Sequence, residues 1–423
     1  MTRTAAVPTR PAARRRPTPT ETARLLPASG GPTYREHLDR VGPLPAAGPG
    51  LIQEVLESGL RGRGGAGFPT GRKMVAVRGR RGPAVVVANG TEGEPLSAKD
   101  RVLLARNPHL VLDGLVAVGA ALRGDRIIIA VERARQDTVA ALRHALVERP
   151  DHGPVIELVQ TPSRYIAGQE TALVRWINGG EARPVFGNRI YERGVAGRPT
   201  LVDNVETLAH VGLIARFGAG WFRLIGPPAE PGSMLVTVTG GVDRPGVYEV
   251  PIGSSLTQLL GQVGARRVQA LLVGGYFGTW VGGERIAAVP LSAEGLATVG
   301  SRPGCGVIVA LPDDVCAWAE VATVAEFYSA HSAGQCGPCV FGLEDIARAV
   351  RGVLAGDPEA EAAARHWTAM VKGRGACHLP DGAAGFVESA LDVFGGEIAD
   401  HRLGRCQRPH HGYLPSPAPG DWR

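Results

Sequence analysis

Three cysteines have the spacing of ligands at a metal centre. Cys336 and Cys339 form a C-x-x-C pair at the start of a predicted helix, and Cys377 follows with His378 beside it. Such a pair with a distant third cysteine suits an iron–sulfur cluster, or a zinc ion bound by three cysteines and a histidine. An unliganded pair of buried thiols is a further alternative. Two other cysteines are interpreted as core residues, namely Cys305 and Cys316.

A glycine-rich segment has the composition of a phosphate-binding loop. Residues 61–73 read Arg-Gly-Arg-Gly-Gly-Ala-Gly-Phe-Pro-Thr-Gly-Arg-Lys. A predicted helix rather than a strand precedes it, which argues against the dinucleotide fingerprint of similar spacing. Glycines let main-chain N–H groups converge on an anion, while Arg63 and Lys73 add positive charge and Phe68 offers a ring for stacking. The segment predicts a site for a planar, phosphate-bearing ligand; a flexible surface loop is the alternative.

An amide and two carboxylates follow the first predicted strand, at 84–88. Asn89, Glu92 and Glu94 lie just past its carboxyl end, where open parallel sheets bind their ligands. Carboxylates at this place hydrogen-bond ribose hydroxyls or a carboxamide, and an amide pairs with the edge of a heterocycle. A solvated acidic turn is the alternative.

The elements that must position these residues form three groups. Strands at 84–88, 126–132 and 155–160 alternate with helices at 108–122 and 134–147, which predicts a parallel sheet covered on both faces. Four short strands and one amphipathic helix then indicate a small α+β module, at 234–239, 246–250, 256–263, 270–273 and 306–311. Helical patterns follow and suggest a four-helix bundle, at 315–331, 340–354, 359–372 and 382–394.

The composition is that of a folded protein with several domains. The chain has 423 residues, of which 44% are hydrophobic and 20% charged, so one core is not enough for it. No stretch reaches the roughly 20 apolar residues of a membrane span, so the chain is expected to be soluble or at most peripheral. The net charge of +6 is spread along the chain, which argues against a nucleic-acid partner. The cysteine spacing indicates a reducing compartment, and we expect the cytoplasm.

Both ends of the chain are expected to be loose. Residues 1–50 are predicted to be a largely disordered Arg/Pro-rich tail and lead-in. The arginines resemble those of an organelle transit peptide, but the prolines oppose an amphipathic helix. Pro415, Pro417 and Pro419 predict a second tail over 406–423.

Four motifs in the same order resemble one protein family. They are the segment 59–71, Asn89 with Glu92, Glu94 and Pro95, the segment 165–173 and the segment 199–208. Together they are similar to the NADH-oxidising, FMN-binding subunit of respiratory complex I and its relatives in NAD-linked hydrogenases and formate dehydrogenases. The likeness runs from about residue 51 to residue 401.

The resemblance implies a fold and an activity. It implies a Rossmann-like α/β domain for FMN and NADH over 51–224, a ubiquitin-like β-grasp domain of the SLBB type over 225–312, and an all-α four-helix bundle with a 4Fe–4S cluster over 313–405. The implied enzyme is an oxidoreductase of the NADH dehydrogenase type. Hydride passes from NADH to FMN, and single electrons pass through the cluster to a ferredoxin-like or iron–sulfur protein or subunit.

The resemblance also implies which residues bind the cofactors. The residues expected at FMN and the nicotinamide nucleotide are Gly62, Arg63, Gly64, Gly65, Gly67, Phe68, Lys73, Asn89, Glu92, Glu94, Gly168, Gln169, Glu170, Asp203, Asn204 and Thr207. Lys73, Glu94 and Glu170 are expected to be catalytic, in the sense that they bind and orient the reactants, because hydride transfer needs no protein acid or base. A carboxylate that faces the ribose repels a 2′-phosphate, so Glu170 favours NADH over NADPH.

The chain departs from the family pattern at the cluster. Ala333 stands where the family has its first cysteine, and alanine does not bind iron. The resemblance therefore implies a 4Fe–4S cluster on Cys336, Cys339 and Cys377 with a different fourth ligand. The candidates are His331, His378, Cys406, water or a partner, and loss of the cluster is the alternative.

Further departures lie around the nucleotide site. Thr91 replaces an aspartate, Gln169 a glutamate and Asp203 an asparagine, and a Pro-Pro-Phe-Pro segment is only partly kept at 184–187. These changes favour a divergent member outside the main respiratory complex. Two other functions stay open, namely a cofactor-poor scaffold that docks partners, and the reverse reaction that reduces NAD. The glycine-rich loop and Glu170 favour the enzyme over the scaffold.

Overall fold

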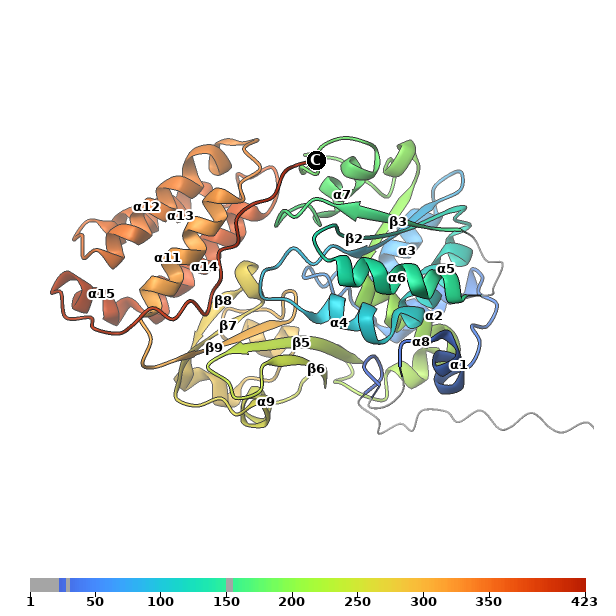
Figure 1. Ribbon diagram of the computed structural model, residues 1–423, viewed down its shortest axis with the longest axis horizontal. Helices are drawn as coiled ribbons and strands as arrows, with labels where there is room; N and C mark the ends of the chain where they lie inside the picture. The colour runs from blue at the N-terminus through green and yellow to red at the C-terminus, as the bar shows by residue number, and fades with distance from the viewer. Residues whose placement is uncertain (1–22, 28–30, 150–154) are drawn as a thin grey trace, which may run out of the picture.

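The structure is a computed structural model that describes residues 23–27, 31–149 and 155–423. It consists of a parallel-sheet unit, a mixed-sheet unit and a helical unit, with the parallel-sheet and helical units at opposite ends (Figure 1). The predicted fold class is confirmed. Most of the predicted N-terminal tail, residues 1–22, lies outside the described residues.

The parallel-sheet unit contains four strands in the order β3-β2-β1-β4, and every neighbouring pair is parallel. Its elements are α1 (Tyr34–Val41), α2 (Gly50–Ser58), α3 (Thr70–Arg78), β1 (Val85–Gly90), α4 (Lys99–Arg106), α5 (Pro108–Leu122), β2 (Arg126–Glu132), α6 (Gln136–Glu148), β3 (Ile156–Thr161), α7 (Glu170–Ile177), β4 (Thr200–Asn204) and α8 (Val205–Phe222).

Helices and loops cover both faces of this sheet. Alternate residues of a strand face opposite sides, so Val86 and Ala88 of β1 pack into the core formed with α5 and α8. Val85 and Val87 pack instead with Leu173 of α7. Burial on both faces explains the continuous β-branched runs of these strands.

The closest helix contact of this unit is the crossing of α5 and α8. Gly114 faces the backbone of Leu208, and a Cβ atom at position 114 would lie 1.8 Å from the Leu208 carbonyl oxygen. A Cβ atom at position 212 of α8 would likewise lie 2.9 Å from the carbonyl oxygen of Leu110. The two helices therefore touch through main-chain atoms.

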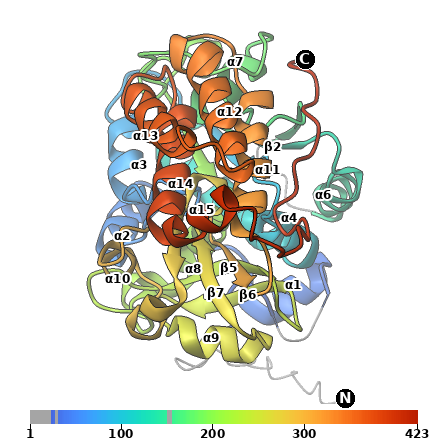
Figure 2. The same cartoon turned by 90° about the vertical axis from the view of Figure 1, so that its left-hand side faces the viewer.

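The mixed-sheet unit contains five strands in the order β6-β5-β9-β7-β8. Its elements are β5 (Ser233–Gly240), β6 (Gly246–Pro251), α9 (Leu256–Val263), β7 (Val268–Val273), β8 (Thr279–Gly282), α10 (Ala293–Ala297) and β9 (Val307–Pro312). One face packs on α9, and the other packs on the helical unit, which lies above the sheet in Figure 2.

The helical unit contains the predicted bundle and one additional short helix. Its elements are α11 (Ala317–Ala330), a π-helical turn (Pro338–Gly342), α12 (Leu343–Leu354), α13 (Ala360–Val371), α14 (Leu379–Val393) and α15 (Gly395–Arg402). Single-turn π-helices occur frequently at functional sites, and this turn carries Cys339 of the C-x-x-C pair.

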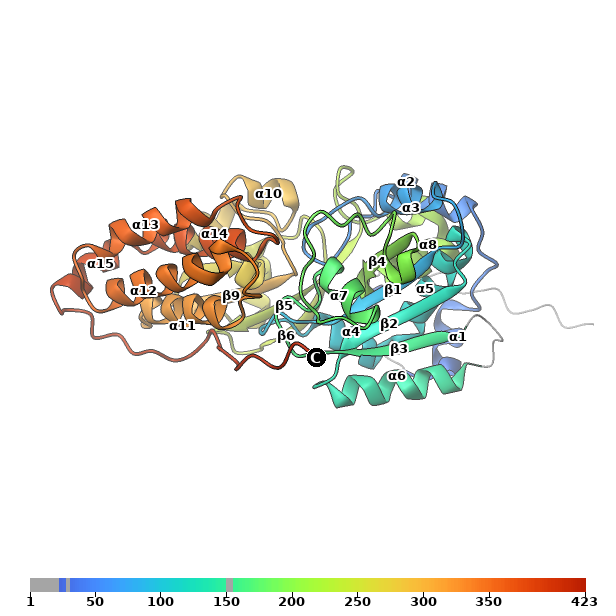
Figure 3. The same cartoon turned by 90° about the horizontal axis from the view of Figure 1, so that it is seen from above.

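Two predictions about the chain ends are wrong within the described residues. Before residue 51, α1 begins with a capping box between Thr33 and Glu36, and Leu25 is fully buried. The end of the chain, which we call the C-terminal strap (residues 403–423), runs from α15 along the helical unit to the parallel-sheet unit (Figures 1 and 3).

Packing and hydrogen bonds hold the C-terminal strap in place. The buried Glu320 carboxylate accepts the N–H groups of residues 412–414. The Trp422 ring lies 4.1 Å from the guanidinium of Arg164 and 4.5 Å from that of Arg183. Proline content predicted a loose tail, but proline carbonyls still accept hydrogen bonds, as that of Pro417 does from His331 at 3.0 Å.

Candidate functional site

The glycine-rich loop is closed at its base. An isolated bridge joins Arg61 to Pro69, and the Gly62 N–H donates to the Phe68 carbonyl at 2.9 Å. Gly65 has a φ of 111° and Gly67 a φ of 62°, so this turn requires glycine at both positions. The loop lies over the junction of β4 and α8, because the Arg63 N–H donates to the hydroxyl of Thr207 at 2.9 Å.

Four consecutive main-chain N–H groups lie at the tip of this loop. They belong to Gly64, Gly65, Ala66 and Gly67; residues 63–66 form a turn, but none of the four N–H groups makes a hydrogen bond of good geometry within the described part of the chain. Their residues are exposed or partly exposed. An array of free amides beside the N-terminus of a helix, here α8, is a typical anion site.

The Arg63 side chain does not extend from the loop as we expected. It is buried, donates to the Ser233 carbonyl at 3.1 Å and lies 3.9 Å from the Glu206 carboxylate. Its guanidinium therefore joins the parallel-sheet unit to β5, and of the two predicted cations it is Lys73 that is partly exposed, at 27%.

Lys73 forms ion pairs with two of the carboxylates predicted at the site. Its Nζ lies 3.5 Å from Glu170 Oε2 and 3.6 Å from Asp203 Oδ1, and it donates to the Val202 carbonyl at 2.5 Å. Burial disfavours the charged amine, but the two carboxylates outweigh it and raise the pKa of Lys73. Asp203 Oδ2 is buried and has no hydrogen-bond partner among the described residues, so its capacity to accept a hydrogen bond is unused.

Asn89 and Gln169 tie the loop before α7 to the sheet. Asn89 Nδ2 donates to the Gly168 carbonyl at 2.8 Å. The Gln169 side chain caps α7, because its Oε1 accepts the N–H groups of Thr171 and Ala172 at 2.9 and 3.1 Å. A cap needs only a side-chain oxygen, which explains why glutamine serves here. Glu170 then stands at the first position of α7 and is 44% exposed.

The two glutamates of the acidic turn have different surroundings. Glu92 caps α4, since its carboxylate accepts the N–H groups of Asp100 and Arg101 at 2.9 and 3.2 Å. Glu94 is buried against the mixed-sheet unit and accepts the Tyr276 N–H at 2.9 Å and the Tyr165 hydroxyl at 3.2 Å. Burial raises the pKa of Glu94 to about 7.

A buried charge network that the sequence analysis missed supports Asn204. Lys99 Nζ contacts Asp100 at 2.7 Å, Glu206 at 2.9 Å and Asn204 Oδ1 at 3.2 Å. Burial opposes its charge, yet Asp100 and Glu206 raise the pKa of Lys99 overall. Glu206 lies in the motif 199–208, but the sequence analysis gave it no role, because its partner Lys99 lies far away along the chain.

Two aromatic rings near these residues in sequence are exposed. Phe68 is 55% and Phe186 is 80% exposed. The segment that holds Phe186 is fixed to α7, because the Val185 N–H donates to the Thr171 hydroxyl at 2.9 Å. Exposed rings on anchored loops are available for stacking.

The three predicted metal-ligating cysteines are brought together. Cys336 and Cys339 flank the start of the π-helical turn, which packs against α14, and Cys377 lies two residues before the start of α14. Burial raises the pKa of Cys339 to about 11, and Cys336 and Cys377 are close enough to add to this shift. The three thiols are thus neighbours in the helical unit.

The proposed alternatives for a fourth ligand lie in different surroundings. His331 is engaged by the Pro417 carbonyl at 3.0 Å, while His378 is exposed beside Asp381. Cys406 lies with Cys316 instead, across the 14 residues of α11 from this site, which is about 20 Å of helix. Cys406 is therefore ruled out. Ala333, where the family cysteine is missing, is buried.

Cys316 is buried, as predicted for a core residue, whereas Cys305 is only partly buried.

Within the described residues, no single helix has the length and apolar character of a membrane span. Only α4 and α5 taken together are long and apolar enough, and these two helices are bent by 96° relative to each other.

Three protein families match successive parts of this chain. The Nuo51 FMN-binding domain matches residues 55–213, the SLBB domain residues 235–273, and the NADH-ubiquinone oxidoreductase-F iron-sulfur binding region residues 319–401. Each match falls on one of the three units described above.

Curated relatives match over most of their length. The F 2 subunit of NADH-quinone oxidoreductase in Rhizobium meliloti (strain 1021) is 32% identical over 83% of this chain and 88% of the relative. The corresponding F subunit in Streptomyces coelicolor (strain ATCC BAA-471 / A3(2) / M145) is 34% identical over 84% of this chain and 83% of the relative.

A solved structure, an NAD+-reducing [NiFe]-hydrogenase in the H2-reduced state, superposes with a TM-score of 0.77 at 28% identity. The match covers 86% of this chain and 64% of the hydrogenase chain, so this chain spans less than two thirds of that neighbour. These similarities confirm the resemblance seen in the sequence, and the chain belongs to the family of the NADH-quinone oxidoreductase F subunits.

Proposed function

We propose that this protein is an NADH-oxidising flavoprotein subunit that transfers electrons from NADH through FMN and a 4Fe–4S cluster to a partner. The observation that carries the proposal is the row of four main-chain N–H groups at residues 64–67, beside the N-terminus of α8, none of which makes a well-formed hydrogen bond among the described residues. The family matches to an FMN-binding domain and an iron-sulfur binding region support it.

The residues present fit FMN. The free amides of the loop suit its phosphate, and the unpartnered Asp203 Oδ2 is an acceptor for an N–H or hydroxyl of the ligand. Lys73 balances the charge of the nearby carboxylates. When bound, FMN supplies the step from two-electron to one-electron transfer. The described residues supply binding and orientation.

The residues that we assign to the nicotinamide nucleotide are Phe68, Glu94 and Glu170. The exposed Phe68 ring stacks on a base or nicotinamide. Of the two carboxylates beside Lys73, Glu170 is the more exposed one, and it accepts hydrogen bonds from ribose hydroxyls. A 2′-phosphate would meet Glu170 and Asp203 together, so we propose NADH rather than NADPH as the donor.

Flavin absorption tests this function. The full-length protein, purified with FMN present, is expected to be yellow, and anaerobic NADH is expected to bleach the flavin band. NADPH at the same concentration is expected to bleach it more slowly. A colourless protein that does not take up FMN, or a bound flavin that NADH leaves unchanged, would contradict the proposal.

We propose that Cys336, Cys339 and Cys377 hold the cluster, with a fourth ligand that is not a cysteine. Three converging thiols suit a 4Fe–4S cluster that lacks one protein thiolate. One iron is then coordinated by His378, by water or by a partner, because Ala333 offers no ligand.

The missing cysteine leads to a test of this cluster. Ala333→Cys should raise iron and acid-labile sulfide per chain and slow iron loss to a chelator by at least about tenfold. Ala330→Cys, which places a thiol on the exposed last residue of α11, is the control. Equal iron content in the two variants would show that position 333 does not face the cluster.

The partner and the compartment are also proposals. We propose a ferredoxin-like or iron–sulfur subunit as the acceptor, because single electrons from a cluster require another one-electron carrier. All six cysteines are free thiols, which supports a reducing compartment such as the cytoplasm.

A further inference from the structure

A second group of thiol and imidazole side chains lies at the opposite end of α11 from the C-x-x-C pair. Cys316 is the residue before α11, His401 lies in the last turn of α15, and Cys406 lies in the C-terminal strap. One ligand atom from each lies within 4.8 Å of the others. Neither cysteine lies within residues 319–401, which match the iron-sulfur family.

We propose that Cys316, His401 and Cys406 bind a zinc ion that fastens the C-terminal strap to the helical unit. Two thiolates and an imidazole are a ligand set that zinc prefers in tetrahedral sites. Zn–S bonds of about 2.3 Å and Zn–N bonds of about 2.0 Å, at a tetrahedral angle, separate sulfur from nitrogen by about 3.5 Å. The Sγ of Cys316 and the Nε2 of His401 are 3.5 Å apart.

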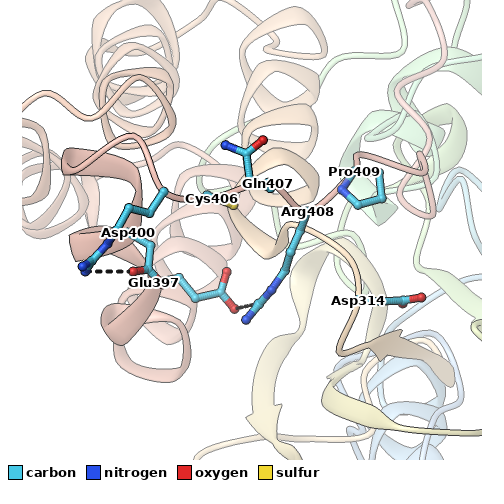
Figure 4. A pocket seen from close by; sticks show the side chains of 8 residues that line it. Asp314, Glu397, Asp400, Cys406, Gln407, Arg408 and Pro409 are labelled. Carbon is cyan, nitrogen blue, oxygen red and sulfur yellow. Dashed lines mark hydrogen bonds and ion pairs between the residues drawn. The ribbon is translucent and has the colours of Figure 1, made fainter.

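Glu397 is one candidate for the fourth position. It lines a pocket of about 450 Å³ together with Cys406 (Figure 4). Its Oε1 accepts a hydrogen bond from Arg408 at 2.7 Å, whereas its Oε2 is buried and has no partner among the described residues. An unpaired buried carboxylate oxygen is costly, and a cation in this pocket removes that cost. Water from the pocket is the other candidate.

The position of the site explains a structural role. The Cys316 N–H donates to the Pro409 carbonyl at 3.0 Å, so the strap already meets the first turn of α11 beside the site. A zinc ion here joins residue 316 to residue 406 and holds the root of the strap. The remainder of the strap then reaches the carboxylate of Glu320 and, further on, the parallel-sheet unit.

Metal analysis of the full-length protein tests the site. Zinc and iron per chain are measured by plasma mass spectrometry after purification under reducing conditions. We expect one zinc per chain, lost in Cys316→Ser, His401→Gln and Cys406→Ser, because losing a direct ligand exceeds the roughly 10–100-fold cost of outer-sphere changes. Iron should stay at the wild-type level in these variants. Cys336→Ser is the matched control and should lose iron while it keeps zinc.

Limited proteolysis tests the fastening role in the wild-type protein, without relying on the folding of a variant. A chelator should speed tryptic cleavage after Arg402 and Arg405 at the root of the strap, and added zinc should reverse the effect. Cys406→Ser should be cleaved quickly with or without chelator. The proposal is overturned if the wild-type protein holds no more zinc than a Cys316→Ser/Cys406→Ser double variant, or if Cys336→Ser loses the zinc. It is also overturned by a Cys316–Cys406 disulfide in the reduced protein, or by a rate of tryptic cleavage that the chelator leaves unchanged.

Discussion

Replacing Lys73 by methionine should weaken FMN binding about 100-fold and abolish bleaching by NADH at ordinary flavin concentrations. Lys73 lies within 3.6 Å of Glu170 and Asp203. Without the amine, two carboxylates stand unpaired beside the phosphate-binding loop. Truncating one partner of a buried charge pair at a binding site costs about 2–5 kcal/mol of binding free energy, and because Glu170 is 44% exposed, water keeps the cost near the lower end, which is about the energy of a 100-fold change.

The measurement is the dissociation constant for FMN by quenching of flavin fluorescence. Lys372→Met is the matched control, because Lys372 is exposed and pairs only with Glu388 among the described residues; its affinity should stay within about twofold of the wild type. If Lys73→Met binds FMN as tightly as Lys372→Met, the site is not where we place it.

Gly114→Ala should destabilise the parallel-sheet unit by more than about 3 kcal/mol, beyond the usual range for overpacking. The added methyl group would lie 1.8 Å from the carbonyl oxygen of Leu208 and 2.5 Å from its carbonyl carbon. Both are main-chain atoms, so relief requires α8 to move away from α5. The expected fall in Tm is about 10 °C for a unit of this size.

A second glycine provides the control for this prediction. Gly385 lies inside α14, and a Cβ atom there would meet nothing within 4 Å. Gly385→Ala should therefore stabilise the protein by about 0.5–1 kcal/mol, because alanine lowers the entropy of the unfolded chain. Denaturant unfolding followed by circular dichroism measures both variants. An unchanged midpoint for Gly114→Ala would show that α5 and α8 separate at little cost.

The sequence predicted the elements whose signal is local. The β-branched run of β1 and the helical periodicity of α13 and α14 depend on near neighbours, and their bounds agree within a few residues. β4 was missed, because its five residues follow a stretch rich in glycine and proline, and it becomes a strand by pairing with β1. Pairing between distant segments leaves little local pattern.

The sequence predicted where the candidate site lies better than it predicted what each side chain contacts. Asn89 and Asn204 pair across β1 and β4, so the two motifs meet, as the edge of a parallel sheet requires. The inward turn of Arg63 was not predictable, because it depends on Ser233 of another unit. The capping role of Glu92 was missed because α4 itself was not recognised.

The direct junction of β4 and α8 has a consequence for engineering. The strand ends at Asn204 and the helix begins at Val205, so no linker residue absorbs a displacement. A shift of α8 against α5 would carry Asp203 and Thr207 with it and distort the cofactor pocket. Core substitutions between these helices that change thermal stability would therefore also change catalytic activity. Substitutions on the solvent-facing sides of α13 and α14 can raise thermal stability without affecting the cofactor pocket.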